Sequence, residues 1–210
     1  MKKKIWFRIM LVCTIAGVVA LSLGVVDCLK LITKGPMNYA EISIKEYKNG
    51  TMVDGEIKYV LDAPVKEVDA NKGEESDARA YFYLVPIKPG EEGTTSEKKI
   101  FLLVESRNKN DHKILNKIME ETSNNEDTSS SLKITGKVVK LDKETEEILA
   151  DWFISNQFFA ENERDEISEY VVSNIIRLQN WDAIYTTTGI GFVLLVLGLV
   201  GIIIILKKRE

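Results

Sequence analysis

Cysteine is scarce in this sequence of 210 residues, and the positions of the two cysteines exclude an internal disulfide in any domain that follows residue 28. Cys13 lies inside an apolar run and Cys28 lies at the edge of the same run, so no cysteine pair exists beyond residue 28. A domain in that later part of the chain must therefore be stable without disulfides. Cys13 is typical of an apolar filler, because a free cysteine behaves as a small hydrophobic side chain.

Histidine and the common catalytic motifs are equally scarce. His112 is the only histidine, and no second His or Cys stands at metal-ligand spacing from it. The sequence has neither the Gly-x-Ser-x-Gly elbow of serine hydrolases nor a glycine-rich phosphate loop. The acidic clusters at 74–77 and 161–166 lack the pattern of a calcium loop and are interpreted as solvated faces. We therefore predict no catalytic residue, no metal ligand and no cofactor, which favours a protein that is not an enzyme.

Charged residues are missing from two long runs, one near each end of the chain. The run from Thr186 to Leu206 holds 21 residues, enough for a helix to cross a bilayer core of roughly 30 Å. The run from Ile9 to Val26 holds 18 residues, near the lower limit for a span. We therefore predict transmembrane helices at 9–27 and 183–206, with the lipid bilayer as their surroundings.

Basic residues next to these runs predict the orientation. The tails at 1–8 and 207–210 hold seven of the 28 Lys and Arg residues and one of the 32 acidic residues. Basic flanks resist translocation across the membrane. We therefore expect a two-span protein of the cell membrane, with both termini cytoplasmic and the central domain extracytoplasmic. A cleaved signal peptide over 1–26 is the alternative, although the apolar run is longer than a usual signal core.

The segment between the predicted spans is acidic. It holds the remaining 21 basic and 31 acidic residues, a net charge of −10 over residues 27–182. Domains that bind nucleic acid usually carry a basic patch or stripe, and no such stripe is visible in the sequence. We therefore leave nucleic acid out of the expected partners.

Small residues recur along one face of each predicted span, where a second helix can approach closely. The helix-packing residues predicted on this ground are Ala16, Ala20, Gly24, Thr187, Gly191 and Gly198. They indicate that the two spans associate with each other, with a second copy of the chain or with a membrane-protein partner. Gly and Ala are also common in membrane helices generally, which leaves a purely compositional explanation open.

Aromatic residues flank both predicted spans. Tyr and Trp gather where a membrane helix leaves the hydrocarbon core, because their rings have an apolar body and a polar edge. The residues predicted to lie at the membrane interfaces are Trp6, Trp181 and Tyr185.

Alternating apolar and polar residues predict strands between the spans. The predicted strands cover 40–44, 53–61, 81–87, 100–104 and 132–138. An apolar stripe at 114–119, with Asn110 or Asp111 as the N-cap, predicts one helix after the fourth strand. Apolar residues at helical spacing predict two further helices, at 143–159 and 161–180. The second of these is expected to continue into the second span, because no Pro or Gly lies between Glu161 and Gly189.

Two glycines share a position in these strands. Gly55 and Gly136 each lie between two aliphatic residues on the apolar face of a strand, which is typical of a bulge or a sharp bend. The predicted fold is therefore α+β: a small curled antiparallel β-barrel, OB-like in pattern only, with one inserted helix and C-terminal helices, flanked by two transmembrane helices. The β-rich domain is expected at 28–141 and the juxtamembrane helices at 142–182.

The layout resembles the uncharacterised two-span membrane proteins that are common in Gram-positive bacteria. The features that carry the resemblance are the Met1-Lys2-Lys3-Lys4 start, the single outer domain and the Lys207-Lys208-Arg209 end. The resemblance covers the full length of the chain. It implies no activity and transfers no functional residue.

Two functional hypotheses follow from these patterns. The favoured one is a membrane-anchored extracytoplasmic binding or interaction module, either a subunit of a larger membrane complex or a sensor. The alternative is a cell-envelope enzyme or a carbohydrate-binding protein. The alternative requires a cleft with convergent carboxylates or aromatic side chains, so the cavities of the folded domain discriminate between the two.

Overall fold

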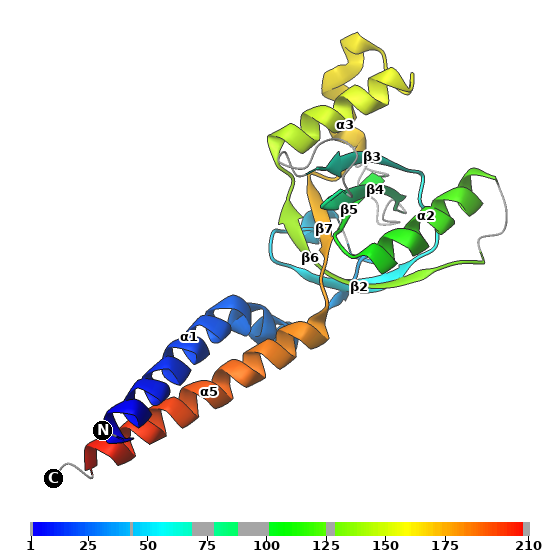
Figure 1. The fold of residues 1–210 in the computed structure, drawn as a ribbon. Helices are drawn as coiled ribbons and strands as arrows, with labels where there is room; N and C mark the ends of the chain where they lie inside the picture. Colours follow the sequence, from blue (N-terminus) through cyan, green and yellow to red (C-terminus); the bar gives the residue numbers. More distant parts are fainter. Residues whose placement is uncertain (1, 43, 69–77, 88–100, 125–128, 208–210) are drawn as a thin grey trace. The chain divides into compact units, whose positions relative to one another are not determined.

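The computed structural model describes residues 2–42, 44–68, 78–87, 101–124 and 129–207 (Figure 1). The chain divides into two compact units. The first combines Met1–Gly35 with Asn180–Glu210, and the second is Pro36–Gln179. The β-rich segment and the segment after residue 141 therefore belong to one unit.

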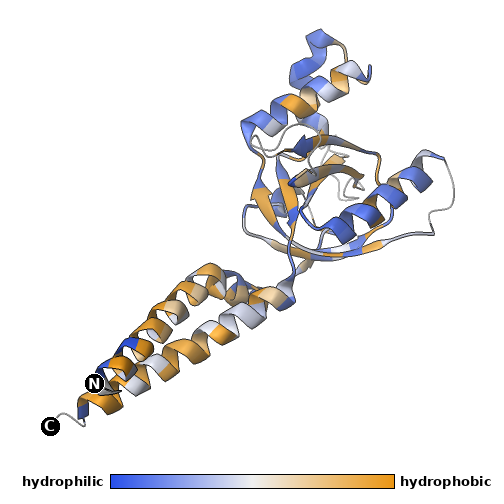
Figure 2. Cartoon of the chain, viewed as in Figure 1, coloured by the Kyte–Doolittle hydropathy of each residue, from blue (hydrophilic) through white to orange (hydrophobic). Residues whose placement is uncertain are grey.

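The first unit consists of two long helices, α1 (Lys2–Lys34) and α5 (Trp181–Lys207). Both are long and apolar enough to cross a membrane, and Figure 2 shows apolar residues along most of their length. At a rise of 1.5 Å per residue, α1 measures about 50 Å and α5 about 40 Å. The helix α1 continues beyond the predicted limit at residue 27 and ends at Lys34. It is followed by Gly35, whose φ of +68° is a left-handed conformation that favours glycine.

The second unit is built on a mixed sheet. Within the described residues, seven strands lie in the order β1-β2-β6-β7-β5-β4-β3. They are β1 (Met37–Asn38), β2 (Met52–Ile57), β3 (Asp62–Glu67), β4 (Ala80–Pro86), β5 (Phe101–Ser106), β6 (Leu132–Lys140) and β7 (Asn174–Leu178). The pairs β1/β2 and β5/β7 are parallel and the other pairs are antiparallel.

Helical segments pack against both faces of the sheet. They are α2 (Lys109–Ser123), α3 (Lys143–Ser155) and α4 (Ile167–Tyr170), with 3₁₀ turns η1 (Ile44–Glu46) and η2 (Glu161–Glu166). Leu115 of α2 belongs to one buried cluster and Phe153 of α3 to the other. The neighbours Ile175 and Ile176 of β7 point into opposite clusters, as the two-residue period of a strand requires.

The α+β class predicted from the sequence is confirmed, but the barrel is wrong. The sheet is open, with β1 and β3 at its two edges. Two of its pairings are parallel, which a curled antiparallel barrel would not contain. Alternation identifies a strand but carries no information about its partners, so it could not distinguish a closed barrel from an open mixed sheet.

The helix predicted at 161–180 is also wrong, and with it the continuous helix into the second span. This segment folds as η2, α4 and β7, and α5 begins anew at Trp181. The apolar residues Ile167, Val171 and Ile175 follow helical spacing by coincidence. Consecutive buried β-branched residues at Ile175 and Ile176 favour a central strand, because a strand can bury side chains on both faces.

Smaller differences concern element limits. The strand predicted at 40–44 is absent from the described residues there, which form turns leading into η1. The strand predicted at 53–61 ends at Ile57 as β2, and residues 58–61 form the connection to β3, which begins at Asp62. The N-cap of α2 is Asn108, whose side chain accepts a hydrogen bond from the backbone N–H of Asn110.

Gly55 and Gly136 lie at crowded points of β2 and β6. Gly55 has a φ of +142°, and a Cβ there would lie 2.6 Å from the ring of Tyr39. A Cβ at Gly136 would lie 2.8 Å from the backbone oxygen of Arg177. Gly136→Val should therefore lower the free energy of unfolding by about 1–3 kcal/mol through overpacking, measured by thermal unfolding. Lys133→Val, at an exposed position of the same strand, is the control, and equal melting of the two variants would contradict the prediction.

Candidate functional site

The two long helices form an antiparallel pair in which small residues bring the backbones together. A Cβ at Gly191 of α5 would lie 2.9 Å from both the Cβ of Ala20 and the backbone N of Leu21 on α1. A Cβ at Gly17 of α1 would lie 2.5 Å from the backbone N of Leu195. Because these neighbours are mostly backbone atoms, a larger side chain at either glycine would force the helices apart.

The predicted packing residues divide into two groups. Ala20, Gly24, Gly191 and Gly198 lie in the contact, where a Cβ at Gly24 would meet the hydroxyl of Thr188 at 2.7 Å. Ala16 and Thr187 are exposed, one position away from the contact. The sequence interpretation missed Gly17 and Thr188. The signal that could have found Gly17 is the seven-residue spacing shared by Gly17 and Gly24, and by Gly191 and Gly198, which is the period of a left-handed helix pair.

The predicted interface aromatics lie near the ends of this pair. Trp6 is near the start of α1 and is exposed. Trp181 and Tyr185 occupy the first turns of α5, where Tyr185 is exposed and Trp181 is half-buried. In an antiparallel pair, these positions put Trp6 at one end and the other two aromatics at the opposite end.

The domain carries a cavity of about 330 Å³, here called the basic cleft. Its wall comes from the residues just before and in β4, from the end of β5 and from the first turns of α2. The lining residues are Ala78, Arg79, Tyr81, Ser106, Arg107, Asn108, Lys109, His112 and Lys113. Sheet pairing sets Tyr81 directly opposite Ser106, which brings the two strand segments to one place. Four of the nine lining residues are cationic, and none of these described lining residues is acidic.

His112 is held beside the cleft by two tyrosines and an amide. Its ring stacks on Tyr81 with centroids 3.8 Å apart. Its Nδ1 is hydrogen-bonded to the hydroxyl of Tyr83, which also bonds to Asn116 Oδ1 at 3.0 Å. Asn116 Nδ2 lies 3.3 Å from Nε2 of the same imidazole. One assignment satisfies all three contacts: Nδ1 donates to Tyr83, Tyr83 to Asn116, and Asn116 to Nε2.

Burial changes the acidity of two groups near this network. The pKa of Tyr83 is raised chiefly by desolvation, with a smaller effect from Tyr81. Desolvation also raises the pKa of Asp111 in the first turn of α2. Both shifts have the direction expected when burial disfavours a negative charge. His112, interpreted from the sequence only as lacking a metal-binding partner, thus belongs to an ordered aromatic wall.

A fully buried carboxylate supports the cleft from behind. Glu105 of β5 has no solvent-exposed surface. It accepts hydrogen bonds from Arg107 Nε at 2.5 Å and from Arg177 Nε at 2.6 Å, and it stands opposite Arg177 in the β5/β7 register. Arg107 also lies 3.8 Å from Glu67, which is 3.6 Å from Arg79. The two cleft arginines are therefore oriented by carboxylates outside the cleft.

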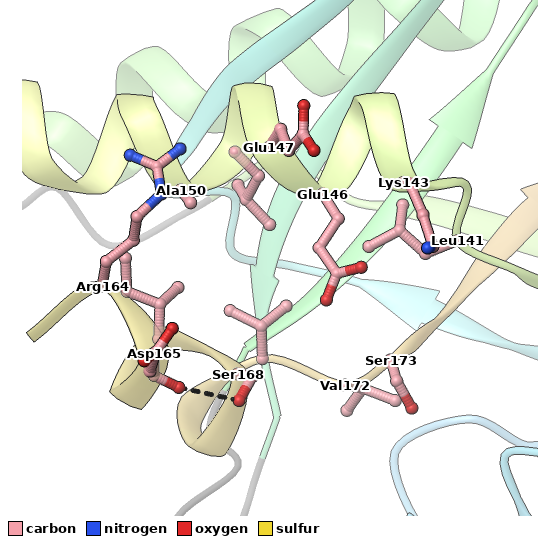
Figure 3. A pocket seen from close by; sticks show the side chains of 13 residues that line it. Leu141, Lys143, Glu146, Glu147, Ala150, Arg164, Asp165, Ser168, Val172 and Ser173 are labelled. Atoms are coloured by element: carbon pink, nitrogen blue, oxygen red, sulfur yellow. Dashed lines mark hydrogen bonds between the residues drawn. The ribbon is translucent and has the colours of Figure 1, made fainter.

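A second cavity, of about 400 Å³, lies beside α3 and is here called the α3 pocket (Figure 3). Figure 3 shows α3 on one side and the segment from η2 to β7 on the other. Its charged lining residues are Lys143, Glu146, Glu147, Arg164 and Asp165, above apolar residues that include Leu149 and Ile167. Arg164 donates to Asp151 of α3 at 2.6 Å and so fastens η2 to the helix.

No metal centre emerges from the part of the chain that the structure describes, since no group of three or more His, Cys, Asp or Glu residues there could hold an ion. A family model described as a domain of unknown function (DUF8577) matches residues 1–205. No curated protein and no solved structure matches the chain.

Proposed function

Since the chain belongs to the DUF8577 family, whose description names no activity, we propose a function from the geometry: the protein is a membrane-anchored binding module. The α1–α5 pair holds the protein in the cell membrane. The domain at 36–179 binds a ligand or partner on the extracytoplasmic side. The observation that carries the proposal is that both ends of one compact domain lead into helices of span length.

The surface of the helix pair supports insertion into lipid. Large apolar side chains point outward along both helices, among them Val12 (64% exposed), Leu23 (76% exposed) and Ile204 (50% exposed). In water such a surface would drive association, whereas acyl chains would cover it in a bilayer. The close backbone contact at Gly17 and Gly191 is the packing expected in lipid, where burial of apolar surface does not drive helices together.

The orientation rests on the basic tails. Lys4 and Arg8 precede the apolar part of α1, and Lys207 ends α5. An antiparallel pair brings these two ends to one side of the membrane, and basic residues favour the cytoplasmic side. The acidic domain is then extracytoplasmic. We propose lipid as the constant partner, with a second copy or another membrane protein against the outer faces of the pair, and no nucleic acid.

Cysteine labelling tests the orientation. In a background with Cys13→Ala and Cys28→Ala, a membrane-impermeant maleimide should label Ser129→Cys in intact cells. Lys4→Cys and Lys207→Cys should be labelled only after the cells are permeabilised, because both tails are cytoplasmic. Labelling of Lys4→Cys in intact cells would reject the arrangement with both ends inside. The intact mass of the purified protein separately tests cleavage of residues 1–26.

A cell-envelope enzyme or carbohydrate-binding protein is the second candidate, and the α3 pocket is the observation that favours it. Glu146, Glu147 and Asp165 all line this pocket, and paired carboxylates are the usual groups in enzymes that cleave sugars. Purification of the intact protein from membranes separates the two candidates. Co-purification of a membrane protein supports the binding module, whereas retention on isolated cell-wall glycan that is lost in Glu146→Gln supports the second candidate.

A further inference from the structure

We propose that the basic cleft binds the phosphate group of a small organic phosphate, either a soluble compound or a lipid headgroup. The inference deepens the proposed binding function and rests on it, because it gives the chemical class of the ligand. The observation behind it is the gathering of Arg79, Arg107, Lys109 and Lys113 around one cavity without a lining carboxylate among the described residues.

The arginines are arranged for an oxyanion. Arg107 is fixed by Glu105 at 2.5 Å and approached by Glu67 at 3.8 Å, and Arg79 is fixed by Glu67 at 3.6 Å. Their side chains are nonetheless 43% and 64% exposed, so both guanidinium groups keep N–H donors accessible to a ligand. A guanidinium presents donors in a planar fork that matches the oxygens of phosphate. The carboxylates thus orient the arginines without occupying the cleft.

Two lysines of α2 also line the cleft and add to its cationic wall. Lys109 and Lys113 are one turn apart on α2 and therefore share a face of the helix. Like charges four residues apart destabilise a helix, so a bound anion would relieve this repulsion. The first turn of α2 adds the positive end of a 15-residue helix beside the same cavity.

The overall acidity of the domain does not cancel this local charge. The net charge of −10 between the spans is spread over 156 residues. At physiological ionic strength, charges separated by more than about 8 Å are largely screened from each other. A ligand inside the cleft is therefore governed by the cations that line it and by Glu105 and Glu67, the carboxylates next to the two arginines, rather than by the distant acidic surface.

The size and the wall of the cleft favour an organic phosphate over the bare ion. Its volume of about 330 Å³ falls within the range of small-molecule sites, roughly 300–1,000 Å³. Tyr81, backed by the stacked ring of His112, provides one apolar wall. Such a combination of cations and an aromatic surface suits a phosphate attached to a carbon skeleton.

Calorimetry on the full chain in nanodiscs of phosphatidylcholine tests the site, with pyrophosphate and glycerol 3-phosphate as soluble probes. We expect saturable binding of one molecule per chain. Lys109→Gln with Lys113→Gln should weaken the affinity about tenfold or more, because two charge-assisted contacts are removed. Lys117→Gln, one turn further along α2 and outside the cleft lining, should change the affinity less than twofold. Circular dichroism establishes that each variant is folded.

Vesicles containing phosphatidylglycerol distinguish the source of the phosphate. Vesicle binding that is lost in the double Lys variant, without binding of soluble probes, assigns a lipid headgroup and supports the proposal. Absence of binding in both assays overturns it, and so does binding that the double variant leaves unchanged. Both faces of a nanodisc are open to the probe, so an error in the proposed membrane orientation would not alter this result.

Discussion

Gly191→Val is expected to separate α1 from α5, whereas Gly189→Val, two residues away, is expected to leave them packed. A Cβ at Gly191 would lie 2.9 Å from the Cβ of Ala20 and 2.9 Å from the backbone N of Leu21, while a Cβ at Gly189 has no neighbour within 4 Å. A backbone atom cannot turn away as a side chain can. The overpacking should cost about 1–3 kcal/mol of helix association. The two variants have the same residue change on the same helix, so they differ only in position.

Disulfide cross-linking measures the separation. A Cβ at Gly201 would lie 3.5 Å from the Cβ of Met10, a distance that a disulfide accepts. With native cysteines replaced, the pair Met10→Cys and Gly201→Cys should cross-link readily in membranes. Adding Gly191→Val should slow cross-linking about tenfold, and adding Gly189→Val should not. Equal rates in the two variants would show that the small-residue contact does not hold the helices together.

The two long helices were predictable because the missing charge is a property of the sequence itself. Their contact face was only partly predictable. A four-residue spacing selects Ala16 together with Ala20, but the structure leaves Ala16 exposed and buries Gly17. The reason is that two helices wound around each other repeat every 3.5 residues rather than every four, so the face drifts by one position within a few turns.

The sheet was predictable strand by strand but not in its pairing. The apolar runs at 81–87 and 100–104 correspond to β4 and β5, which lie inside the sheet. The place of β7 between β5 and β6 was missed. It depends on long-range pairing between residues 104 and 176, and local periodicity does not contain that information. The strand β7 joins β5 to β6 and makes one of the two parallel pairings of the sheet, so the arrangement of the sheet could not be predicted without it.

The basic cleft was hidden for a similar reason. Arg79 comes before β4, Arg107 follows β5, and the lysines belong to α2. In the sequence, Arg79 follows the acidic cluster at 74–77, acidic residues at 105 and 111 are interspersed with the other three cations, and the net charge of the whole segment between the spans is negative. Only the i, i+4 spacing of Lys109 and Lys113 is a local signal. A concentration of charge made by three separate elements is visible only once the β4/β5 pairing is known.

The largest effect on domain stability is expected from removing both arginine partners of Glu105. Glu105 is fully buried and accepts hydrogen bonds from Arg107 and Arg177 at 2.5 and 2.6 Å. Arg107→Met with Arg177→Met keeps most of the aliphatic stems but leaves an uncompensated buried carboxylate. A change of this kind typically costs about 3–5 kcal/mol. Chemical denaturation of the full chain in detergent, followed by near-ultraviolet circular dichroism, measures the loss.

A third substitution then identifies the cause. Adding Glu105→Leu to the double arginine variant removes the buried charge and should restore most of the lost stability, since apolar replacements of buried ion networks are often neutral or stabilising. Glu105→Leu alone should cost much less than the double arginine variant, because Arg107 and Arg177 are 43% and 39% exposed and can be hydrated by water. If the triple variant stays as unstable as the double variant, the arginines stabilise the domain through their own packing. Recovery in the triple variant assigns the cost to the buried charge of Glu105, the group that also fixes Arg107 at the edge of the basic cleft.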